Sequence, residues 1–197
     1  LVSLPYLTRA RILATADAAR DALWAKALSV GATHGVQYVE LRHHERVLRA
    51  PTVTHEKSEK VLMVLDLPRL DETLWVDLDA KVRNAVRKGD KSHATIRWGG
   101  SYLLDDFYRI FAENMRDLGT PVYPRRLFAS ILEQFPDEAE LAVVDIEGKV
   151  AAGAMLIHES FGRQRRTQVP SASSLKRFNS TGANMWMYWQ LIRRAIE

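Results

Sequence analysis

A pair of apolar runs joined by a very short polar segment sets the first limit on the fold. The runs cover residues 141–146 and 150–157, and Glu147, Gly148 and Lys149 lie between them. Apolar runs of this length around a short glycine-containing segment predict an antiparallel β-hairpin. The chain is therefore expected to contain a sheet whose apolar faces are covered by other elements.

The sequence on either side of the hairpin supplies those elements. Residues 101–118 place apolar side chains along one stripe at helical spacing, and further helical patterns cover residues 71–88, 125–135 and 183–197. Residues 93–98 and 167–173 have the pattern of strands. We therefore expect an α+β fold, with a mixed, mostly antiparallel sheet flanked by helices.

The N-terminal third of the chain has its own pattern. Residues 17–30 predict a helix, residues 36–42 alternate apolar and polar as a strand does, and the apolar run 61–67 predicts a buried strand closed by Pro68. We expect one unit in residues 1–67 and a second in residues 68–197.

Composition excludes several classes of chemistry. The chain has no cysteine, which excludes disulfides, thiolate catalysis and cysteine-bound zinc. His43, His44 and Glu45 are neighbours, which point to opposite faces of a strand, so we expect no metal site. No run of about eighteen apolar residues occurs, so we expect no membrane span and a cytoplasmic location. The net charge of +4 favours an anionic partner.

Three segments carry longer motifs: Asn-Met-Arg-Asp-Leu-Gly-Thr-Pro-Val-Tyr at 114–123, Phe-Pro-Asp-Glu-Ala at 135–139 and Val-Pro-Ser-Ala-Ser-Ser-Leu at 169–175. Together with Asn184-Met185 and Tyr188-Trp189, they resemble FemAB-related proteins associated with exosortase and exopolysaccharide loci. The resemblance implies a tandem GNAT-like fold. Residues 1–67 would then be the C-terminal part of a first unit, and residues 68–197 the N-terminal part of a second unit that lacks its last strands. It also implies a piece of a longer protein.

The activity that the resemblance implies is transfer of an acyl or aminoacyl group to an amine of a cell-envelope or exopolysaccharide precursor. The implied donor is acyl-CoA or aminoacyl-tRNA, so the partners would be a small-molecule or glycan-precursor substrate and RNA. In GNAT folds, backbone N–H groups of a splayed strand polarise the acyl carbonyl and a helix N-terminus shields the leaving group. The matching segments here are 169–173 and 181–184.

This sequence departs from the family patterns in several ways, two of which concern the predicted site. The Arg/Gln-x-x-Gly-x-Gly/Ala loop of ordinary GNAT enzymes is absent before residue 183, which favours a donor bulkier than acetyl-CoA. Ser171 stands where FemAB-related proteins usually have tryptophan. Two other functions stay open: a non-catalytic module that binds an anionic glycan or RNA, and an acetyl-CoA-dependent GNAT N-acetyltransferase.

Basic residues of the predicted helix 71–88 are candidate substrate ligands. Arg83 and Arg87 are four residues apart and share a helix face, where two guanidinium groups can bind a phosphate. Lys81 matches the family's Lys-x-Arg pattern, whose basic residues lie near the phosphate-bearing substrate in relatives. The alternative interpretation of all three is a solvated helix face.

Polar residues near turns and strand ends complete the predicted site. Tyr123 follows the Gly-Thr-Pro turn between two helices, and His158 ends a strand as a candidate general base; both are candidate catalytic residues. The structural alternatives are packing of Tyr123 on the core and simple half-burial of His158. The other substrate-binding candidates are Asn114, Arg116, Ser173, Ser174, Asn179 and Asn184.

Overall fold

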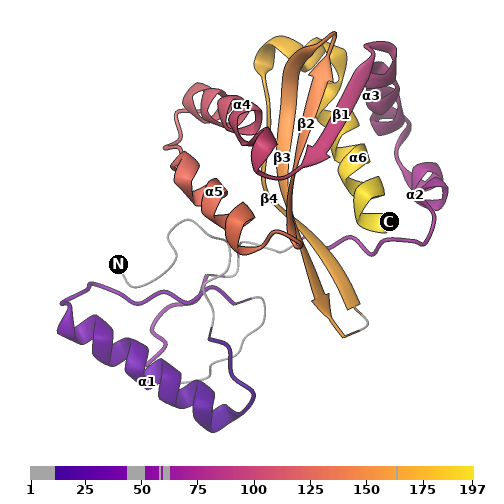
Figure 1. Ribbon diagram of the computed structural model, residues 1–197. Helices are drawn as coiled ribbons and strands as arrows, with labels where there is room; N and C mark the ends of the chain where they lie inside the picture. Colours follow the sequence, from indigo (N-terminus) through magenta and orange to yellow (C-terminus); the bar gives the residue numbers. More distant parts are fainter. Residues whose placement is uncertain (1–11, 44–51, 58, 60–62, 163) are drawn as a thin grey trace. The chain divides into compact units, whose positions relative to one another are not determined.

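The computed structural model describes residues 12–43, 52–57, 59, 63–162 and 164–197. The chain divides into two compact units, Leu1–Leu65 and Asp66–Glu197 (Figure 1). The division falls two residues before the boundary expected from the sequence. The assignment of the two units to parts of a tandem repeat stays a prediction.

The second unit is built around one antiparallel sheet in the order β1-β2-β3-β4. Its strands are β1 Ala94–Gly99, β2 Ala139–Ile146, β3 Lys149–Phe161 and β4 Gln164–Ser174. Its helices are α2 Asp71–Asp77, α3 Ala80–Lys91, α4 Leu104–Asp117, α5 Arg125–Gln134 and α6 Ala183–Ile196, with 3-10 turns η1 Ser101–Leu103 and η2 Lys176–Thr181. This arrangement confirms the predicted α+β fold class.

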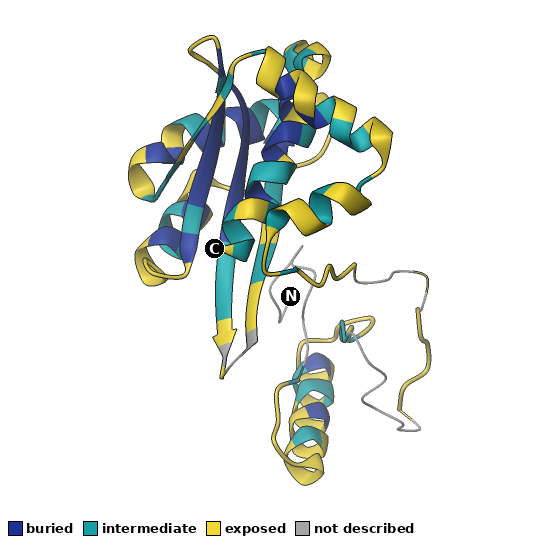
Figure 2. Ribbon diagram, turned by 90° about the vertical axis from the view of Figure 1, so that its right-hand side faces the viewer, coloured by how far each residue is buried: buried dark blue, intermediate teal, exposed yellow. Residues whose placement is uncertain are grey.

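Helices cover both faces of the sheet: α4 and α5 lie on one side, and α3 and α6 on the other (Figure 1). The central strand β2 shows why. Leu141 and Val143 belong to the buried cluster under α4, whereas Ala142 and Val144 belong to the cluster under α6. Because both faces of the strand are buried, its sequence is a continuous apolar run rather than an alternating one. Figure 2 shows this buried layer inside exposed helix surfaces.

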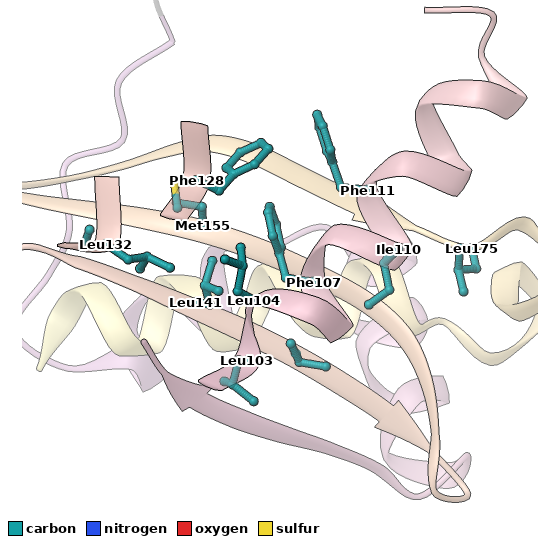
Figure 3. Close-up of a cluster of buried hydrophobic side chains, with 12 residues drawn as sticks. Leu103, Leu104, Phe107, Ile110, Phe111, Phe128, Leu132, Leu141, Met155 and Leu175 are labelled. Carbon is teal, nitrogen blue, oxygen red and sulfur yellow. The ribbon is translucent and has the colours of Figure 1, made fainter. Parts of the chain in front are cut away.

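The core under α4 and α5 is aromatic. The Phe107 ring meets the Phe128 ring edge-on at a centroid distance of 5.1 Å, and Phe111 meets Phe128 at 5.0 Å (Figure 3). Phe107 and Phe111 are one helical turn apart in α4, as the predicted apolar stripe requires. Edge-to-face ring contacts of this kind add to the stabilisation from buried apolar area.

The core on the other face depends on a close crossing of α3 and α6. A Cβ atom at Gly89 would lie 2.4 Å from Cβ of Trp186, so only glycine fits there. Trp186 in turn donates its indole N–H to Oδ1 of Asp90 at 2.7 Å. The helical pattern predicted up to residue 88 therefore stops too early, because Gly89 lies inside α3 and lets the two helices approach.

The predicted single helix over 71–88 is two helices. Leu78 adopts an extended backbone with ψ 141°, which ends α2, and α3 begins at Ala80. Apolar spacing cannot reveal such a break, because Trp75 of α2 and Val86 of α3 both pack in the same hydrophobic cluster.

The first unit contains helix α1 Asp17–Thr33, as predicted, and its buried Trp24 donates an indole hydrogen bond to Oγ1 of Thr52 at 2.9 Å. The strand expected at 36–42 is wrong, because Arg42 forms only an isolated bridge there and Tyr38 is 75% exposed.

The prediction of a buried strand at 61–67 is also wrong over its described residues, 63–67. These residues are irregular, and Met63 is 86% exposed. Residues 61 and 62 lie outside the described residues. An apolar run becomes a buried strand only when other strands and covering elements pack against it. Of the described helices, none has both the length and the apolar content that a membrane crossing requires.

Candidate active site

Strand β4 is an edge strand with an interrupted register. In the described part of the chain it pairs with β3 alone. Ser171 lies opposite Met155 and Gln168 lies opposite Ile157, so two residues, Val169 and Pro170, face a single residue of β3. This is a β-bulge, and a proline is tolerated there because it has no N–H to offer a ladder.

The free edge of β4 presents backbone donors and acceptors. The N–H of Leu175 donates to the carbonyl of Ala151 at 2.9 Å. The backbone groups of Leu175 therefore point toward β3. Because antiparallel pairs alternate, the N–H and C=O groups of Ala172 and Ser174 point away from β3, toward the free edge. Unpaired strand edges of this kind are ready to hydrogen-bond an extended ligand.

Two predicted substrate-binding residues meet on the α4 side of β4. Asn114 donates from Nδ2 to Oγ of Ser173 at 3.2 Å, and Ser173 is only 3% exposed. Close by, Lys176 donates to the carbonyl of Asp117 at 3.1 Å. These bonds hold the end of β4 against the C-terminal half of α4. The side chains of Asn114 and Ser173 therefore hydrogen-bond each other within the fold. Arg177 adds an ion pair with Glu113.

The first turn of α6 follows directly. Gly182 adopts φ +78°, and the N–H of Ala183 donates to Oγ1 of Thr181 at 3.3 Å. No side chain of the described residues caps the next amides of the helix, and Asn184 is exposed in this turn. A Cβ atom at Gly182 would lie 2.5 Å from the carbonyl of Ala85, so α3 packs directly against the junction.

The predicted basic ligands of α3 have different surroundings. Arg83 donates from Nη1 to the carbonyl of Val76 at 2.9 Å and also to that of Leu78, so it binds the C-terminal end of α2. Arg87 stacks over the Trp75 ring at 5.5 Å. Lys81 is exposed. The geometry thus gives the two arginines structural contacts, while their role toward a phosphate stays a prediction.

The predicted catalytic residue Tyr123 packs in the core. Its ring stacks on Phe111 at a centroid distance of 6.2 Å with an interplanar angle of 6°, and its carbonyl accepts a hydrogen bond from the Tyr108 hydroxyl at 3.0 Å. Two other predicted residues lie on the surface: Arg116 pairs with Asp117 at 3.2 Å, and Asn179 is exposed in η2.

His158 belongs to a polar network that crosses three strands. Its Nδ1 lies 2.9 Å from Oγ1 of Thr167 on β4, and its Nε2 lies 3.0 Å from Oε1 of Glu140 on β2. Arg194 of α6 donates from Nε and Nη2 to the two oxygens of Glu140, at 2.9 and 3.1 Å. Burial alone would raise the pKa of Glu140, but the hydrogen bonds from Arg194 and His158 outweigh it and lower that pKa.

No pattern in the sequence points to Glu140, Thr167 or Arg194 as site residues. They are 9 to 54 residues apart from their partners in the network and meet only through strand register and helix packing. A period-two pattern along β3 places His158 on the same face as Ala154 and Leu156, but it does not identify the residues opposite.

Comparison with known proteins agrees with this architecture. The family model described as an acetyltransferase (GNAT) domain matches residues 78–197. No curated protein matches the chain. Among solved structures, FemX is similar at 13% identity with a TM-score of 0.57, over 66% of this chain and 48% of FemX. The chain thus spans about half the length of FemX.

Two other solved structures are similar at TM-scores below 0.5. The C-terminal domain of a putative lysylphosphatidylglycerol synthetase from Agrobacterium fabrum has 14% identity and a TM-score of 0.44, over 59% of this chain and 37% of that one. A predicted acetyltransferase with acetyl-CoA from Clostridium acetobutylicum has 11% identity and a TM-score of 0.40, over 52% and 73%.

Proposed function

Because the chain belongs to the acetyltransferase (GNAT) domain family, a family of acyltransferases, we propose that it takes part in transferring an acyl or aminoacyl group to an amine. The acceptor amine belongs to a cell-envelope or exopolysaccharide precursor. This finer assignment is supported by the FemAB-type motifs at 114–123 and 169–175. The fold that the chain shares with FemX is compatible with it.

The observation that carries the proposal is the free edge of β4 beside the first turn of α6. The outward N–H groups of Ala172 and Ser174 can hold the extended part of an acyl donor by backbone hydrogen bonds. The bulge at Val169 and Pro170 interrupts the strand and makes room for the reacting carbonyl. The amides of the first turn of α6 are placed to stabilise negative charge on the leaving group.

In the proposed reaction, the neutral amine nitrogen attacks the acyl carbonyl carbon and forms a C–N bond. The C–S bond of a thioester donor, or the C–O bond of an aminoacyl ester, then breaks. Its electron pair stays on the sulfur or oxygen of the leaving group. The amine must also lose one proton during these steps. Backbone N–H groups that stabilise the carbonyl oxygen as it becomes negative contribute most when they are rigidly held, as they are in a strand.

The segment between β4 and α6 favours a donor bulkier than acetyl-CoA. Lys176 and Arg177 are engaged by α4, and η2 occupies the positions where a glycine-rich loop would surround a pyrophosphate. An aminoacyl ester donor does not require that loop. Aminoacyl-tRNA is therefore a better candidate donor than acyl-CoA.

The test replaces the outward amide of Ser174. Ser174→Pro removes an N–H that faces the free edge and leaves the hydrogen bonds to β3 in place. We expect it to weaken donor binding at least about tenfold, which corresponds to about 1.4 kcal/mol. The measurement is calorimetry of the full chain with aminoacyl-tRNAs and acyl-CoAs, followed by mass spectrometry of amine products.

Ser174→Ala is the matched control, because it keeps the amide and removes only the hydroxyl. It should bind the donor within a few-fold of the unchanged chain. The proposal fails if neither class of donor binds the unchanged chain, or if both variants bind as it does.

A further inference from the structure

The Glu140 carboxylate determines which groups donate and which accept hydrogen bonds in the network around His158. Arg194 donates to both oxygens of Glu140, so the carboxylate is ionised at neutral pH and can only accept hydrogen bonds. Nε2 of His158, 3.0 Å from Oε1 of Glu140, must therefore carry a proton. In a neutral imidazole Nδ1 is then the acceptor, and the Thr167 hydroxyl, 2.9 Å away, donates to it.

We propose that Thr167 passes the proton of the acceptor amine to His158 during acyl transfer, with Glu140 and Arg194 as positioning residues. This inference rests on the proposed function. Thr167 is the group that touches the substrate, because both ring nitrogens of His158 are already engaged.

The place of Thr167 on β4 suits this role. It lies two residues before Val169 at the bulge, a span of about 7 Å along a strand. Thr167 is half-buried rather than enclosed, and its hydroxyl proton is directed at His158. A substrate amine reacting near the bulge therefore comes within reach of Thr167.

The proposed proton transfer balances. Once the amine nitrogen has bonded to the acyl carbon, its proton moves to Oγ1 of Thr167, and the hydroxyl proton of Thr167 moves to Nδ1 of His158. The hydroxyl is thereby restored and an imidazolium forms. The imidazolium then returns its proton through Thr167 to the departing thiolate or alkoxide, so no other reactant is required.

The charges around the ring can accommodate the imidazolium. Glu140 from β2 faces His158 directly, and Arg194 from α6 lies behind that carboxylate. Arg194 also pairs with Glu197 at 3.0 Å, so its positive charge is balanced by two carboxylates. The positive charge on His158 therefore meets a carboxylate rather than an unbalanced cation.

The first experiment reads the tautomer without any need for turnover. Long-range ¹H–¹⁵N NMR spectra of the labelled full chain near neutral pH should show His158 protonated at Nε2 and bare at Nδ1, its signal being the one lost in His158→Gln. Glu140→Gln should abolish this preference. A ring protonated at Nδ1, alone or together with Nε2, would overturn the relay.

The second experiment separates a proton relay from a structural contact. Thr167→Val keeps the shape of the side chain and removes the hydroxyl, so kcat should fall about 100-fold while KM stays unchanged. Thr167→Ser restores a hydroxyl and should recover most of kcat. If the Thr167 hydroxyl is purely structural, Thr167→Val lowers Tm and leaves kcat unchanged. That result would contradict the inference.

The outcomes for the two proposals differ. Turnover by the unchanged chain with an unaffected Thr167→Val variant contradicts the relay and leaves the transferase function in place. A lack of donor binding contradicts the transferase function and the relay with it. The expected tautomer together with a kcat effect in Thr167→Val supports both.

Discussion

At the scale of single residues, Gly182 is the position where backbone conformation and packing both exclude a side chain. Its φ of +78° lies in the left-handed region, and a Cβ atom would stand 2.5 Å from the carbonyl of Ala85 in α3. Gly182→Ala should therefore lose about 3 kcal/mol of unfolding free energy, from the left-handed backbone and the clash together. Urea unfolding of the full chain measures the loss.

Gly119 provides the control for this prediction. It also has a positive φ, +66°, but a Cβ atom there would meet nothing within 4 Å. Gly119→Ala should cost only about 1–2 kcal/mol, because only the backbone term remains. Equal losses in the two variants would show that α3 does not press on the junction as described.

At the scale of elements, helix α2 depends on a side chain from the next helix. Arg83 of α3 donates to the carbonyls of Val76 and Leu78, which end α2 and have no partner of their own within it. A cation at a helix C-terminus also interacts favourably with the helix dipole. Arg83→Ala should therefore lower the unfolding free energy by about 1.5 kcal/mol, measured by urea denaturation.

Lys81→Ala is the matched variant on the same helix. Lys81 is exposed, and its removal should change stability by less than about 0.5 kcal/mol. If Arg83→Ala is as stable as Lys81→Ala and instead binds the donor more weakly, Arg83 acts on the substrate rather than on α2.

At the scale of the whole molecule, the second unit holds its own core. The three buried clusters consist of residues between Val86 and Leu191, whereas the described residues of the first unit bury only Trp24 and Gly31. A fragment of residues 66–197 should therefore unfold cooperatively, with a Tm close to that of the full chain. Thermal unfolding followed by circular dichroism measures this.

Phe107→Ala serves as a reference for this comparison. Phe107 is fully buried, so the variant should lose about 3–5 kcal/mol in the fragment and in the full chain alike. A fragment whose Tm is lower by more than about 8 °C, equivalent to about 2 kcal/mol, would show that the first unit contributes to the core.

The sequence alone determined the elements whose signals are local. The stripe along α4 and the turn at Glu147 and Gly148 were predictable, because helical spacing and turn chemistry act between near neighbours. The order of these elements was also enough to predict the α+β class.

Which residues meet across the sheet depends on three-dimensional packing. The network of Thr167, His158 and Glu140 depends on strand register, and the position of Gly89 inside α3 depends on Trp186 from a distant helix. The run at 63–67 is apolar, yet it is exposed because nothing in the described fold packs against it as a strand. Register and burial are contacts between segments far apart in the chain, and local patterns do not encode them.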